Sequence, residues 1–155
     1  MPSTRTRLVL SAVLLAAVAA AAQAQGQPSK AEQALKYRKA VYQAIAWNFG
    51  PMSAMAQGKV PYEAKEFEMR AQRVAALTPM LSESYSPDTQ SVTGSKAKPE
   101  LWSNRADFDA KMKTLVERSA TLASVSKGGD FEKSKAAFLD TANACKSCHD
   151  KYKAD

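Results

Sequence analysis

Apolar residues recur along the chain at alternating spacings of three and four, which is the pattern that one face of an amphipathic helix produces. The first such stretch starts at Ser29, which together with Glu32 three residues later matches a capping box. It runs to about Gly58, a residue suited to ending a helix. Its repeating face carries Leu35, Arg38, Tyr42, Ile45, Phe49, Met52 and Ala56. Gly50-Pro51 interrupts this stretch, so we expect the helix to kink or to divide there.

Three further stretches carry the same periodicity, over residues 61–81, 99–127 and 130–152. Proline opens the second and third stretches and aspartate opens the fourth, and both residue types favour the start of a helix. Pro79 should loosen or kink the end of the second stretch. Residues 82–98 have the proline, glycine and serine content of a long connection, which we expect to wrap a cofactor or to cross between helices.

No segment alternates between apolar and polar residues with a period of two over a convincing length, so we expect essentially no strand. Four amphipathic helices of about 20 residues each, about 30 Å long, predict an all-α four-helix bundle. Cofactors in such bundles are held by side chains on facing helices.

The first 24 residues have the features of a cleaved signal peptide. Two arginines form a basic start, residues 8–22 are an apolar run, and Ala22-Gln23-Ala24 matches a small-x-small cleavage site. The apolar run is short for a membrane span, and no second apolar stretch follows it. We therefore expect export by the general secretory route, cleavage after Ala24 and one folded domain over residues 25–155.

The chain is basic, with 22 Lys and Arg, 15 Asp and Glu, and a formal net charge of +7. Without the two arginines of the predicted leader, 20 basic residues face 15 acidic ones, which leaves a net charge of +5. The lysines are spread over every segment, and such a distribution is typical of a solvated surface. We therefore expect no nucleic-acid partner.

The strongest chemical signal is Cys145-Lys146-Ser147-Cys148-His149, a C-x-x-C-H sequence of the kind that attaches a c-type haem. Each thiol of such a motif forms a thioether with one vinyl group of the porphyrin, and the imidazole ligates the iron. Positions i, i+3 and i+4 share one face of a helix, so Cys145, Cys148 and His149 can meet one flat macrocycle. This motif predicts covalent haem c with His149 as the axial iron ligand.

Other interpretations of the two cysteines are a thioredoxin-like redox pair, half of a zinc site or a structural disulfide. A redox pair expects a preceding strand and a helix start, whereas this motif falls late in a helical pattern. A zinc site needs about four ligands, and the chain has two cysteines and one histidine. A disulfide gives no reason for a histidine to follow at once.

Two further short sequences are informative: Lys36-Tyr37-Arg38 in the first stretch and Pro99-Glu100-Leu101-Trp102 at the start of the third. Together with the predicted signal peptide and the C-terminal C-x-x-C-H, they resemble cytochrome c′, a class II c-type cytochrome. The resemblance covers about residues 30–153. It implies an up-down-up-down bundle with one covalent haem c, a topology of which cytochrome c′ is itself a standard example.

The resemblance also bears on the second axial position of the iron. Low-spin relatives carry a ligating methionine four residues after the arginine of the first helix, and Tyr42 stands there in this chain. An aromatic residue at that place is implied to cover the distal face without bonding iron, which predicts five-coordinate, high-spin iron. A tyrosine oxygen can ligate haem iron, as in catalase, and an ordinary core aromatic is a further interpretation of Tyr42.

Arg38 is a charged residue on an otherwise apolar face, one turn from Tyr42. A lone buried guanidinium is costly, and a haem propionate is a partner that would offset this cost. The resemblance supports the same role and adds the neighbouring Lys39, where relatives often have glutamine. A side chain that reaches out of the apolar face to solvent is the alternative for Arg38.

The resemblance implies a periplasmic haem protein that binds small neutral gases, nitric oxide first and carbon monoxide next. It also implies electron transfer with a separate, unidentified redox partner. The alternative is a low-spin, six-coordinate electron carrier in which Met55 or another strong ligand reaches the iron. A haem-free thiol-redox or metal module is a third hypothesis.

The sequence shows no general acid–base constellation beyond the iron ligand, so we expect no enzymatic activity. Tyr37, Val41 and Trp47 are predicted to lie outward on the first helix as an exposed patch. Because members of the family usually dimerise through their first two helices, we expect a homodimer. We expect no membrane span in the mature chain.

Overall fold

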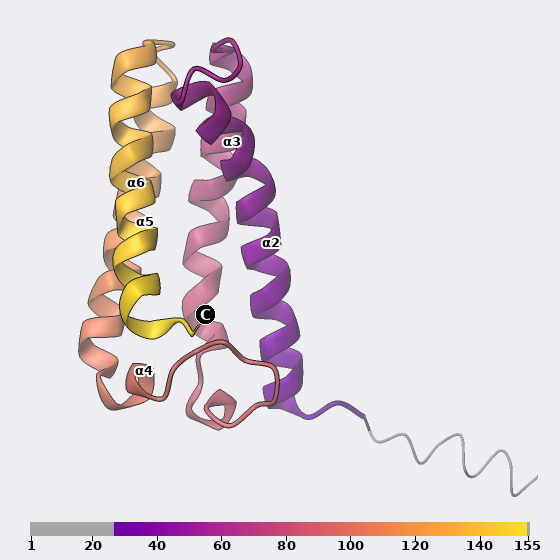
Figure 1. Cartoon of the computed structure of the whole chain (residues 1–155). Coiled ribbons are helices and arrows are strands. Elements are labelled where there is room, and N and C mark those ends of the chain that lie inside the picture. Colours follow the sequence, from indigo (N-terminus) through magenta and orange to yellow (C-terminus); the bar gives the residue numbers. More distant parts are fainter. Residues whose placement is uncertain (1–26, 155) are drawn as a thin grey trace, which may run out of the picture.

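Four long helices run up, down, up and down in the computed structural model, which describes residues 27–154 (Figure 1). They are α2 (Lys30–Ala56), α3 (Ala64–Leu77), α5 (Arg105–Ser126) and α6 (Phe131–Tyr152). The connection between α3 and α5 contains the 3₁₀ helices η1 (Thr78–Ser84) and η2 (Pro87–Thr89) and the short helix α4 (Glu100–Ser103). The described residues form no strand, only an isolated antiparallel bridge between Ala97 and Lys153. The predicted all-α four-helix bundle is confirmed, and the predicted signal peptide lies outside the described residues.

The start of α2 has the predicted capping box. Ser29 Oγ accepts from the backbone N–H of Glu32 (3.2 Å), and the Glu32 carboxylate accepts from the backbone N–H of Ser29 (2.7 Å). The helix continues undivided through Pro51, which has no N–H to donate to the carbonyl of Trp47. Arg70 Nη1 on α3 donates to that carbonyl instead (3.3 Å). A neighbouring helix therefore supplies the hydrogen bond that proline removes.

Two helix boundaries differ from the predicted ones. The second helix begins at Ala64 rather than near Pro61, and beyond Leu77 it tightens into η1, which has Pro79 in its first turn. The third stretch is not continuous, because Asn104 leaves the helical conformation (φ −117°, ψ 43°) and separates α4 from α5. The side-chain Nδ2 of Asn104 donates to the carbonyl of Glu100 (3.1 Å). Asparagine side chains often compete in this way with the backbone hydrogen bonds of a helix.

The core consists of two apolar clusters. The first contains Val41, Leu81, Tyr85, Leu101, Phe108, Met112, Leu115 and Tyr152, and the second contains Met52, Met55, Ala56, Phe67, Ala71, Val74, Leu122 and Phe138. Val41 is only 6% exposed, so the prediction that it faces outward is wrong. Leu81 and Tyr85 belong to the same cluster, and the connection thus covers this side of α2.

The end of the bundle at which α2 begins and α6 ends also holds the connection between α3 and α5 (Figure 1). Backbone hydrogen bonds join that connection to the last turn of α6 and the residues after it: Lys98 N–H donates to Tyr152 O (2.9 Å), and Ala154 N–H donates to Lys96 O (2.8 Å). None of the helices among the described residues is long and apolar enough to cross a bilayer.

Leu122 is fully buried in the second cluster, so Leu122→Ala should leave a cavity that the surroundings fill only in part. We expect the free energy of unfolding, measured by urea denaturation, to fall by about 2–5 kcal/mol. Leu139→Ala makes the same chemical change on α6 at a side chain that is 49% exposed, and its loss should be about 1 kcal/mol or less. Similar losses in both variants would contradict this description of the core.

Candidate functional site

One cavity of about 790 Å³ lies among the four long helices and the connection between α3 and α5. All six residues singled out from the sequence line it: Cys145, Cys148 and His149 on α6, and Arg38, Lys39 and Tyr42 on α2. Its volume falls within the range of about 300–1,000 Å³ that is usual for sites burying small ligands and cofactors. The apolar part of its wall comes largely from the first core cluster.

The C-x-x-C-H motif occupies the last turns of α6, which begins after an N-cap at Asp130 and continues unbroken to Tyr152. Cys145 and Cys148 are half-buried free thiols, and the adjacent His149 is exposed. Partial burial raises the pKa of both thiols, while for Cys148 the nearby Lys111 acts in the opposite direction. Surrounding protein, and secondarily the charge of Lys153, lowers the pKa of His149.

These surroundings fit the alternatives for the two cysteines poorly. A reactive redox cysteine stands near the start of a helix, with a lowered pKa in an electropositive environment. Cys145 stands far from the start of α6, and its thiol pKa is raised. Within residues 27–154, no group of three or more His, Cys, Asp and Glu side chains is placed to hold a metal ion.

Tyr42 lies on α2, lines the same cavity as the motif and packs against the first core cluster. Its hydroxyl is 3.1 Å from the hydroxyl of Tyr85, a buried residue at the end of η1. Burial raises the pKa of Tyr42, and the neighbouring Tyr85 raises it further, so Tyr42 is a neutral phenol at ordinary pH. Sequence reasoning missed Tyr85, whose only signal was a lone aromatic residue in a segment with the composition of a loop.

Arg38 is 4% exposed, so its guanidinium does not reach out to solvent. Its Nε donates to Ser84 Oγ (3.3 Å), and its Nη2 donates to the Ser84 carbonyl and to Thr89 Oγ1 (3.0 Å). The guanidinium also stacks on the ring of Tyr85, with Cζ 3.7 Å from the ring centroid. Burial lowers the pKa of Arg38, although arginine stays protonated in proteins. These partners offset the cost of burying the charge, and the side chain still lines the cavity.

Five cations line the cavity, and no carboxylate does: Arg38, Lys39, Lys96, Lys111 and Lys153. Lys39 is exposed at the rim, where its Nζ lies near Gly94 of the connection. Lys96 and Lys111 were not predicted from the sequence, because their placement depends on how the connection and α5 pack. The resulting positive rim suits a ligand that carries carboxylates.

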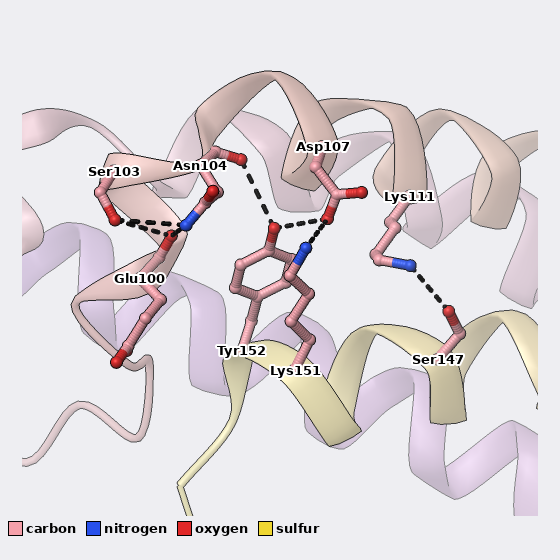
Figure 2. A network of polar contacts seen from close by, with 8 residues as sticks. All are labelled: Glu100, Ser103, Asn104, Asp107, Lys111, Ser147, Lys151 and Tyr152. Carbon is pink, nitrogen blue, oxygen red and sulfur yellow. Dashed lines mark hydrogen bonds and ion pairs between the residues drawn. The ribbon is translucent and has the colours of Figure 1, made fainter.

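A polar network joins the end of α6 to α5 (Figure 2). The Tyr152 hydroxyl donates to Asp107 Oδ2 (2.5 Å), and Lys151 Nζ donates to the same oxygen (3.0 Å). One turn earlier on α6, Ser147 Oγ accepts from Lys111 Nζ (2.9 Å). The hydrogen bonds from Tyr152, and then those from Lys151, lower the pKa of Asp107. These contacts fix the turn that carries the motif relative to the neighbouring helix.

These residues fit an iron porphyrin in several independent respects. Two free thiols and an imidazole lie on one face of a helix at the cavity wall, with the spacing that two vinyl groups and an iron require. Apolar side chains line the interior, and cations without carboxylates line the cavity. A helical bundle with such a cavity has the construction of a c-type haem protein.

Comparison with known proteins agrees with this class. The family model described as Cytochrome C' matches residues 33–153. A cytochrome c′ of Rubrivivax gelatinosus is 38% identical over 127 residues, covering 82% of this chain and 98% of that protein. A cytochrome c′ of Cereibacter sphaeroides is 36% identical over 150 residues, covering 95% and 97%. The chain belongs to the cytochrome c′ family.

Solved structures support the same assignment. The structure of cytochrome c prime from Shewanella frigidimarina aligns with a TM-score of 0.79 at 38% identity, covering 83% of this chain and all of that one. A nitric oxide complex of a variant of cytochrome c prime from Alcaligenes xylosoxidans aligns with a TM-score of 0.75 at 31% identity, covering 83% and 99%. Members of the family carry a covalently bound c-type haem with iron, which is the cofactor of this chain.

Asp107→Asn tests the network at the end of α6. The pKa of Asp107 is lowered in the folded state, so its stabilising effect is present above the unfolded value of 3.8 and is lost as the pH falls through the folded value. The free energy of unfolding should therefore drop less between about pH 6 and about pH 3 in the variant than in the wild type.

Asp109→Asn is the matched control, because it removes the same charge from the same helix at a residue that pairs with Arg105 instead of Tyr152. An equal flattening of the pH dependence in both variants would contradict the role of Asp107.

Proposed function

We propose that this protein is an exported, five-coordinate haem c protein that binds nitric oxide and carbon monoxide and exchanges electrons. The single observation that carries the proposal is the placement of Tyr42 in the same cavity as Cys145, Cys148 and His149. The haem iron, when bound, supplies the redox couple and the coordination position for a gas. The residues of the chain then decide what can approach that position.

In this proposal the thiols of Cys145 and Cys148 form the two thioether bonds, and the imidazole of His149 is the axial ligand. Arg38 and Lys39 lie on the propionate side. Arg38 already donates to Ser84 and Thr89, so a propionate would add an acceptor to a guanidinium that the protein holds in place. That arrangement requires little ordering of Arg38 when the cofactor binds.

Tyr42 is proposed to cover the distal face without bonding iron. Its raised pKa supports this role, because ligation by tyrosine requires the phenolate, which is scarce for a buried phenol at neutral pH. In this role its ring would occupy space that a ligand must enter, and apolar side chains line most of the cavity interior. Small neutral molecules should therefore enter more readily than anions, and nitric oxide and carbon monoxide fit that description. The nitric oxide complexes of variants of a related protein support gas binding.

The second candidate function is low-spin electron transfer, which requires a methionine sulfur on the iron. Met55 belongs to the second core cluster, apart from the cavity, so it does not serve this role without rearrangement. Met112 does line the cavity, but it stands on α5, where the preceding Lys111 bonds to Ser147 of the motif. This placement puts Met112 near the motif helix and not on α2, the helix on which low-spin relatives carry the ligating methionine.

Export to the periplasm is proposed from the leader-like first 24 residues together with the family, whose members are typically exported c-type cytochromes. We also propose that the protein binds gases and transfers electrons but does not catalyse a reaction.

A homodimer through the first two helices is also proposed. Trp47 is 75% exposed and Tyr37 is 38% exposed on α2, so these two residues remain of the predicted patch after Val41 is removed from it.

The ferric spectrum of the purified protein tests the iron coordination. We expect high-spin optical and EPR features, and haem that stays with the polypeptide on a denaturing gel because it is covalently attached. Met112→Leu should leave the spectrum unchanged. A methionine–iron charge-transfer band that disappears in Met112→Leu would establish the low-spin alternative, and a colourless protein would remove both.

Tyr42→Ala tests the distal cover. Removing the ring should speed carbon monoxide association with the ferrous protein by about tenfold or more, which corresponds to a barrier lower by about 1.4 kcal/mol, and should tighten binding. Tyr37→Ala removes a tyrosine from the same helix at the surface and is the matched control. Unchanged rate and affinity in Tyr42→Ala would show that this side chain does not control access to the iron.

A further inference from the structure

The hydroxyl of Tyr42 has one polar partner among the described residues, the hydroxyl of Tyr85 at 3.1 Å. The two residues come from segments far apart in sequence, since Tyr42 lies on α2 and Tyr85 ends η1. Both line the cavity, so the contact is made at the cavity wall. Tyr42 is only partly buried, whereas Tyr85 is 6% exposed.

Tyr85 is held from several sides. The Arg38 guanidinium covers one face of its ring at 3.7 Å, and the ring meets that of Phe108 edge-on with centroids 4.8 Å apart. Its carbonyl accepts a hydrogen bond from Arg105 Nη1 (2.6 Å), and its backbone N–H donates to Ser82 O (3.2 Å). Contacts to α2, α5 and η1 thus fix the position of the Tyr85 hydroxyl.

A fixed hydroxyl can restrict a more mobile partner. Tyrosine side chains reorient by rotation about two bonds, and Tyr42 is only partly buried, whereas Tyr85 is held on several sides. A net hydrogen bond between neutral groups changes the ratio of two orientations by about two- to tenfold. This range is large enough to change how often the Tyr42 ring leaves the path of an entering ligand.

We propose that Tyr85 is a positioning residue for Tyr42: its hydroxyl holds the Tyr42 ring in place and thereby slows the entry of small neutral ligands. The proposal rests on the proposed function, in which Tyr42 covers the distal face. It adds a second residue, supplied by the connection between α3 and α5. Arg38 supports the same arrangement, because it stacks on the ring of Tyr85 and donates hydrogen bonds to the carbonyl of the preceding Ser84 and to the side-chain hydroxyl of Thr89.

Tyr85→Phe is the direct test, since it keeps the ring that packs on Arg38 and Phe108 and removes only the hydroxyl. We expect carbon monoxide association with the ferrous holoprotein to become about two- to tenfold faster. Tyr42→Phe breaks the same hydrogen bond from the other side and should give a similar increase. Because one bond is lost in every case, the double variant should be no faster than the faster single variant.

Tyr62→Phe is the matched control. It removes a tyrosine hydroxyl that donates to Ser134 Oγ (3.2 Å) in the other half of the bundle, and it should leave the association rate unchanged. A second readout needs no gas: ultraviolet resonance Raman bands of tyrosine report the hydrogen bonding of the phenol. In Tyr85→Phe these bands should show that one remaining tyrosine, Tyr42, has lost its partner.

Wild-type association rates in both Tyr85→Phe and Tyr42→Phe would overturn the proposal, as would strictly additive effects in the double variant. If Tyr42→Ala is fast while those two variants keep the wild-type rate, Tyr42 remains the distal cover and only the role of Tyr85 is lost. If Tyr42→Ala itself keeps the wild-type rate, the distal cover fails and the role of Tyr85 fails with it.

Discussion

One buried positive charge, that of Arg38, determines how the chain is arranged around the cavity. A guanidinium away from water is costly unless its donors are paired, and here the partners come from the connection between α3 and α5. Ser84 and Thr89 accept its hydrogen bonds, and the ring of Tyr85 covers its face. The connection therefore folds back on α2 instead of extending into solvent. In doing so it buries Val41 and brings a second tyrosine to the cavity.

The two core clusters differ in what their side chains contact. The second cluster contains close aromatic contacts, such as that between Phe49 and Phe138, whose ring centroids are 4.4 Å apart. The first cluster lines much of a cavity of about 790 Å³. A haem bound there would contact these apolar side chains and would stabilise the folded state by its own binding free energy. The cofactor would then form part of the core in this half of the molecule.

Local signals in the sequence were sufficient for most of the fold and for the centre of the site. The capping box at Ser29, the cap at Asp130 and the three-and-four spacing of apolar residues act within a few residues, so they could be read without the structure. The same holds for Cys145, Cys148 and His149, whose spacing is itself the signal. All the predicted site residues line one cavity, while their individual roles remain predictions.

What could not be read from the sequence depends on tertiary packing. Whether Val41 is buried is decided by a connection some forty residues further along, and no local pattern reports that contact. Asn104 breaks a helix that its neighbours favour, because its amide competes for the carbonyl of Glu100. Tyr85 and Lys111 join the site for a similar reason. In the sequence Tyr85 looks like any loop aromatic and Lys111 like any surface lysine. Only the tertiary fold shows that both line the cavity.

The order of the helices along the polypeptide has a consequence for biogenesis. The motif is carried by α6, the last of the four long helices, whereas α2, α3 and α5 also contribute to the cavity wall. Because a chain is made from its amino end, the thiols that would hold the cofactor are among the last parts of this site to be synthesised. A chain cut short before α6 would keep most of the residues that line the cavity and lose the covalent attachment.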